Sequence, residues 1–148
     1  MRIATATLAI ITSLLASTAH ADAMRNWQVL QGVTITEELD GDIWQAKKSF
    51  SADVLAAAES RNFDIAGFYV PIQAQAYIEF FLLVPDPADC PFCGNGGYGP
   101  SLEVTLKKPM KDMAEFSKLH IRGQLELIDD PTTYQAYRMI DAAVVAAN

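Results

Sequence analysis

The sequence predicts a mainly β fold, a small closed antiparallel β-barrel with one or two short helices. Apolar or alternating runs are separated by turn residues, in the order strand, strand, long loop, strand, short helix, strand, strand. Short antiparallel strands leave unpaired edges, and closure into a barrel removes those edges. The short helix between the third and fourth strands gives the predicted barrel an OB-like character. A β-sandwich is the alternative.

The first 21 residues have the pattern of an export signal. Arg2 is followed by an apolar stretch over 3–16 and by a small-x-small cleavage pattern that ends at Ala21. Cleavage after Ala21 is the first expectation, and cleavage after Ala23 fits nearly as well. A membrane-spanning helix needs about 20 apolar residues, which this stretch does not supply. We therefore expect a periplasmic or secreted protein with no membrane span after processing.

The charge of the chain argues against nucleic-acid binding. The formal net charge is −7, and loss of residues 1–21 removes only Arg2, so the mature charge is −7 − 1 = −8. Affinity for nucleic acid comes mainly from Lys and Arg contacts to phosphates. The remaining 148 − 21 = 127 residues are enough for one core. We expect an N-terminal arm over 22–62 and the barrel over 63–148.

The arm is expected to contain a hairpin and a short helix. The Asp40-Gly41 pair, flanked by apolar residues, predicts a β-hairpin within 25–50. Ser51 is a good N-cap for a helix that ends near Glu59. The sequence leaves open whether the arm packs on the barrel or stands apart from it.

The barrel strands follow from apolar periodicity. Gly123 falls on the inner face of its strand, where a glycine permits sharp coiling or a bulge. His120 falls on the outer face and is interpreted as a solvated side chain beside Arg122. Lys107 and Lys108, followed by Pro109, are interpreted as a solvated turn. The expected strands cover 63–72, 77–84, 102–106, 119–127 and 134–140, with one or two helical turns over 112–117 and a long loop over 85–100.

Three motifs in order resemble a family of exported bacterial proteins that carry a domain of unknown function. They are Gly67-Phe68-Tyr69-Val70-Pro71-Ile72, Phe80-Phe81-Leu82-Leu83-Val84-Pro85 and Cys90-Pro91-Phe92-Cys93-Gly94. The similarity extends roughly from Phe63 to Asp141. The resemblance implies a periplasmic or secreted OB-like module, and it brings no established activity.

The chemistry of the chain rests on Cys90 and Cys93, its only cysteines. In an exported protein they are expected to form a disulfide. In the chain-entropy formula, a disulfide that closes so small a ring stabilises the fold by only about 2 kcal/mol. A role beyond stabilisation is therefore considered. Thiol exchange is one such role, although the glycine-rich segment after Cys93 excludes the helix that a thioredoxin-like site needs.

A soft metal site is the preferred functional hypothesis for this pair. Cys-Pro-x-Cys-Gly has the form of a zinc knuckle, and zinc or copper is the expected ion. A structural zinc needs four ligands, and the chain has no second Cys pair. Asp89 and His120 are the weaker candidates for the remaining positions, and two chains sharing their cysteines are another possibility.

The combined expectation is an exported, non-catalytic binding module with the loop Pro85–Pro100 as its working part. Its partner would be an unidentified protein or a metal ion. The alternatives are a periplasmic thiol-disulfide redox protein and a structural protein with an inert disulfide.

Overall fold

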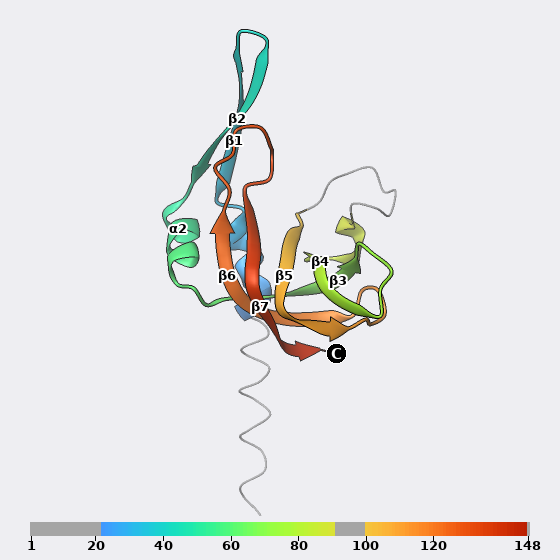
Figure 1. Ribbon diagram of the computed structural model, residues 1–148. Coiled ribbons are helices and arrows are strands. Elements are labelled where there is room, and N and C mark those ends of the chain that lie inside the picture. Colours follow the sequence, from blue (N-terminus) through green and yellow to red (C-terminus); the bar gives the residue numbers. More distant parts are fainter. Residues whose placement is uncertain (1–21, 91–99, 148) are drawn as a thin grey trace, which may run out of the picture.

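The computed structural model describes residues 22–90 and 100–147 (Figure 1). The predicted export signal and Cys93 lie outside these residues. The described part of the chain begins with a helix over 22–30, which the sequence analysis assigned in part to the hairpin region. The elements that follow are β1 (Val33–Asp40), β2 (Ile43–Phe50), α2 (Ala52–Glu59), β3 (Phe63–Pro71), β4 (Tyr77–Val84), η1 (Pro87–Asp89), β5 (Leu102–Lys111), β6 (Lys118–Leu127) and β7 (Tyr137–Ala147).

The closed barrel predicted from the sequence is confirmed. One pair of neighbouring strands is parallel, whereas the prediction was an antiparallel barrel throughout. The strands follow the order β3-β4-β5-β7-β6, and β6 closes the ring on β3. All neighbours are antiparallel except β5 and β7, which run parallel. A ring with an odd number of strands cannot alternate direction throughout, so a five-stranded barrel requires at least one parallel pair. The architecture is consistent with a small OB-like barrel.

The barrel interior is filled by fully buried apolar side chains, each of which stabilises the fold by roughly 1.5–3 kcal/mol. Gly123 adjoins this interior, and a Cβ there would lie only 2.8 Å from Met139 Cγ. The register between β6 and β7 shifts between Arg122 and Gln124, so the predicted irregularity at this glycine is confirmed. The largest interior residues include Tyr69, Phe81, Ile65, Leu83, Leu102, Leu119, Ile121, Leu125 and Met139.

The helix over 22–30 covers a gap beside β3. This strand pairs with β6 from Phe63 to Phe68 but with β4 only from Phe68 to Pro71. Asn26 Nδ2 donates to the Asp64 carbonyl at 2.6 Å, and Trp27 Nε1 donates to the Ala66 carbonyl at 2.7 Å. The helix therefore satisfies carbonyl groups that β4 does not reach. Its buried face has the helical spacing i, i+4, i+7 and consists of Ala23, Trp27 and Leu30.

The predicted hairpin and the helix after it are both confirmed. β1 and β2 form a separate two-stranded sheet that projects beyond the barrel (Figure 1), and Gly41 takes a positive φ of 65° in its turn. Ser51 caps α2 by accepting from the Val54 N–H at 3.4 Å. No helix among residues 22–90 and 100–147 is long and apolar enough to span a membrane.

The helical turns expected over 112–117 are absent, and a turn bonded to β3 stands in their place. Tyr69 N–H donates to the Ser117 carbonyl at 3.0 Å, and Phe116 N–H donates to the Tyr69 carbonyl at 2.8 Å. Phe116 adopts φ 62°, which no α-helix contains. The Tyr69 hydroxyl also donates to Asp112 Oδ1 at 2.8 Å. The expectation was wrong because this segment takes its backbone partners from β3.

Two strands are longer than expected. β5 runs through Lys107, Lys108 and Pro109, so the predicted turn there is wrong. Its pairing with β4 shifts register in this stretch, and the break accommodates a proline that cannot donate to a ladder. β7 starts at Tyr137 and not at Tyr134, because Tyr134 packs against the hairpin.

We expect Tyr69→Phe to lower the free energy of unfolding by about 1–3 kcal/mol at neutral pH, because it leaves Asp112 without this donor. Burial and the Asp112 carboxylate raise the pKa of Tyr69 above its ordinary value of 10.0. A raised folded-state pKa gives stability that is present below the unfolded pKa and is lost as pH rises. The variant should therefore lose less stability than the wild type between neutral pH and about pH 11.

Denaturant unfolding at the two pH values measures both effects. Tyr77→Phe is the matched control, because Tyr77 is 67% exposed. Equal alkaline losses in the wild type and in Tyr69→Phe would contradict the assignment.

Candidate functional site

Cys90 lies in a small apolar cluster separate from the barrel interior. The side chain is 3% exposed and packs with Val70, Leu82 and Val84. η1 places it there: Asp86 Oδ1 accepts from the Ala88 N–H at 2.8 Å, and Cys90 N–H donates to the Pro87 carbonyl at 3.3 Å. The described part of the chain contains no free cysteine.

The residues proposed as metal ligands are not gathered into one site where the structure describes them. Asp89 ends η1, next to Cys90, whereas His120 lies on β6. Among residues 22–90 and 100–147, no group of three or more His, Cys, Asp or Glu side chains has the arrangement of a metal site. Cys93, the second half of the motif, lies outside these residues.

His120 is buried, so its interpretation as a solvated side chain is wrong. It is 7% exposed, and its Nε2 lies 3.0 Å from Asp64 Oδ1 on the neighbouring strand β3. Arg122 Nε donates to both oxygens of the same carboxylate, at 3.0 and 3.1 Å. The carboxylate therefore joins β3 to two residues of β6, which is a structural role.

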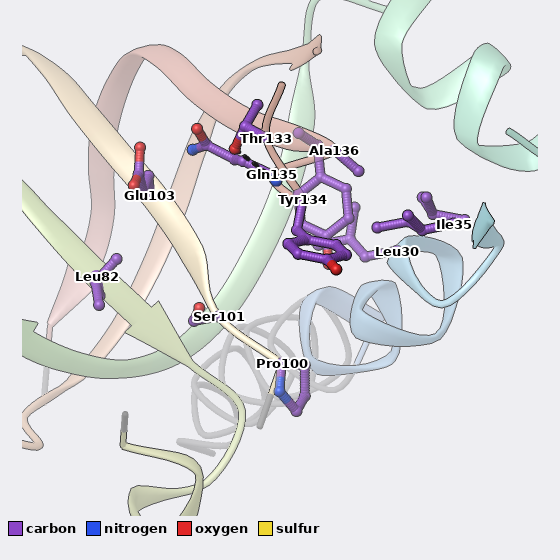
Figure 2. A pocket seen from close by; sticks show the side chains of 12 residues that line it. Leu30, Ile35, Leu82, Pro100, Ser101, Glu103, Thr133, Tyr134, Gln135 and Ala136 are labelled. Carbon is purple, nitrogen blue, oxygen red and sulfur yellow. Dashed lines mark hydrogen bonds between the residues drawn. The ribbon is translucent and has the colours of Figure 1, made fainter. Parts of the chain in front are cut away.

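A groove of about 920 Å³ lies between the hairpin, the start of β5 and the segment before β7 (Figure 2). Most of its wall is apolar, and the polar side chains in it are those of Ser101, Glu103, Thr133 and Gln135 together with the hydroxyls of Tyr134 and Tyr137. The lining residues are Leu30, Val33, Ile35, Leu82, Pro100, Ser101, Glu103, Thr133, Tyr134, Gln135, Ala136 and Tyr137.

Contacts between the hairpin and the segment 130–134 hold the walls of this groove in place. Ala46 N–H donates to the Pro131 carbonyl at 2.8 Å, and Lys48 Nζ donates to the Asp130 carbonyl at 2.6 Å. The rings of Trp44 and Tyr134 lie 4.5 Å apart between centroids. Tyr134 also donates to the Glu37 carboxylate, and this hydrogen bond raises the pKa of Tyr134.

Gln135 provides an unsatisfied donor in the groove. Its backbone N–H donates to Thr133 Oγ1 at 3.1 Å, which fixes the position of the residue. The side chain extends away from Tyr134 and Ile35, toward the side of the groove where Glu103 lies (Figure 2). Its Nε2 atom is buried and has no hydrogen-bond partner among residues 22–90 and 100–147. A buried amide that lacks a hydrogen-bond partner costs about 1–3 kcal/mol.

The comparisons with known proteins add no relative. No family model matches the chain, and no match was found among curated proteins or solved structures. The site must therefore be judged from its own residues.

Sequence reasoning did not find this groove. Its lining comes from the helix over 22–30, from β1, β4 and β5, and from the segment before β7, and no motif joins these segments. Tyr134 and Gln135 were assigned to a strand, where alternation alone carries no sign of a binding role.

We expect Gln135→Met to raise the free energy of unfolding by about 1 kcal/mol, because it removes an unpaired buried amide and keeps the side-chain volume. Denaturant unfolding measures the change. Gln45→Met on β2 is the matched control, since Gln45 is also half-buried and should change little. A clear loss of stability in Gln135→Met alone would show that the amide supports the fold.

Proposed function

We propose that this protein is an exported, non-catalytic binding module and that its ligand occupies the groove. The observation that carries the proposal is the largely apolar groove, whose wall includes a Gln135 amide nitrogen without a partner in the described part of the chain. Ligand sites are typically concave and mostly apolar, with a few polar groups that fix orientation. The export part of the proposal is supported by the signal pattern of residues 1–21.

The polar groups of the groove suit a ligand that carries both a donor and an acceptor. The Glu103 carboxylate accepts from a donor or pairs with a positive charge, and the Gln135 amide donates to an acceptor when its side chain turns its buried Nε2 into the groove. Leu30, Val33 and Ile35 contact the apolar part of such a molecule. An apolar group joined to an amide or an amine meets these requirements.

A neutral hydrophobic fluorophore tests the apolar part of this proposal. N-phenyl-1-naphthylamine should bind the wild type with increased emission, and Ile35→Ser should weaken binding about tenfold. Val145→Ser is the matched control, because Val145 is an exposed strand residue that does not line the groove. Equal weakening by both variants, or no binding to the wild type, would contradict the groove as the ligand site.

We propose that Cys90 and Cys93 form a structural disulfide. The support is the burial of Cys90 among Val70, Leu82 and Val84, together with the absence of a free cysteine in the described chain. A reactive thiol is partly exposed in an electropositive setting, unlike Cys90. The disulfide is therefore favoured over the redox and metal alternatives. The family resemblance also stays a proposal.

Intact mass spectrometry of the protein from an exporting cell tests the disulfide and the processing together. The expected mass is that of residues 22–148, lowered by the two hydrogens lost when two thiols are oxidised by the disulfide oxidant of that compartment. A mass with both thiols reduced and one bound zinc ion per chain would support the metal site and contradict the disulfide.

A further inference from the structure

The outer edge of β1 is an open β-sheet edge. Ala46 N–H points away from β1, because it donates to Pro131, and Glu37 is the residue opposite Ala46 in the register. In an antiparallel ladder, opposite residues either bond to each other or both point outward. The peptide groups of Glu37, and of Ile35 and Leu39 two residues away, therefore point outward. Among the described residues, no backbone hydrogen bond from outside the strand ladders reaches these three residues.

Other parts of the chain cover one edge of the hairpin and leave the other exposed. The edge of β2 is covered by the segment that includes Pro131. On β1 every residue from 34 to 40 is exposed, and the projecting hairpin lies clear of the barrel (Figure 1). Leu39 is 76% exposed, and Ile43 across the turn is 65% exposed. A long, exposed edge with apolar side chains is a template for another strand.

The negative charge near the β1 edge favours a positively charged partner. Residues 36–45 contain Glu37, Glu38, Asp40 and Asp42 and no Lys or Arg. Lys47 Nζ lies 3.4 Å from Glu38 Oε1, but both side chains are more than half exposed. This ion pair therefore offsets little of the negative charge. A second copy paired edge to edge would place acidic residues beside acidic residues, which is destabilising. A basic segment would be attracted.

We infer that β1 binds an extended, basic segment of a partner protein as a third strand of the hairpin sheet. Strand addition obtains its affinity from main-chain hydrogen bonds and its specificity from alternate side chains. Successive side chains of a strand point to opposite faces, so Ile35 and Leu39 share one face with Glu37, whose carboxylate accepts from Tyr134, while Glu38 and Asp40 share the other. The partner segment therefore alternates apolar and basic residues.

Fluorescence anisotropy with a labelled peptide of about eight alternating Val and Lys residues, the length of β1, tests the inference. The wild-type protein should bind it, and binding should weaken as salt is added. The same peptide with Glu in place of Lys should not bind. Equal binding of the two peptides would overturn the inference.

Two variants at position 39 separate the contribution of the backbone N–H to peptide binding from that of the side chain. Leu39→Ala keeps the outward N–H, whereas Leu39→Pro removes it and leaves the bonds between β1 and β2 intact. We expect Leu39→Pro to bind at least tenfold more weakly than Leu39→Ala. Equal affinities would overturn the inference. Binding of the naphthylamine in the groove should not change, since Leu39 does not line it.

A second experiment modifies the peptide and leaves the protein unchanged. In an extended strand, alternate N–H groups point to opposite edges. N-methylation of one alternating set of peptide amides should abolish binding, and N-methylation of the other set should leave it within about threefold. If both sets behave alike, the peptide is not paired as a strand along β1.

Discussion

The fold depends on the hydrogen bonds that Trp27 and Asn26 donate to the carbonyls of β3. β4 reaches only the second half of this strand, so the first half would otherwise have buried carbonyl groups without donors. Each unsatisfied buried group costs about 1–3 kcal/mol, against a net stability of about 5–15 kcal/mol for a domain. The helix over 22–30 therefore completes the barrel at this strand.

The position of that helix determines where the groove lies. Leu30 is buried with Phe63 and Ile65 in the barrel cluster, and only a short turn separates it from β1. Gly32 N–H donates to the Val29 carbonyl, and its own carbonyl accepts from Ser51 N–H, so the two ends of the hairpin are tied together at the helix. The hairpin therefore leaves the barrel at a fixed point, with Val33 and Ile35 facing the segment before β7.

Local patterns predicted the barrel well, and long-range partners decided the rest. Apolar runs located β3 and β4, alternation located β6, and Gly123 indicated the irregularity in β6. The segment 112–117 was mistaken for helix because its bonds run to Tyr69, far away in the sequence. The groove was missed for the same reason, since its lining comes from several segments without a shared motif. His120 was placed on the correct strand, but its burial depends on Asp64.

Hydrogen–deuterium exchange of the Trp27 indole N–H, followed by NMR on the native protein, tests most directly whether the helix completes the barrel. Trp44 is the internal reference, because it is only half-buried. If the Trp27 bond to Ala66 closes the barrel, its proton should exchange only through global unfolding, at least a hundredfold more slowly than that of Trp44. Comparable exchange rates for the two indoles would contradict this account.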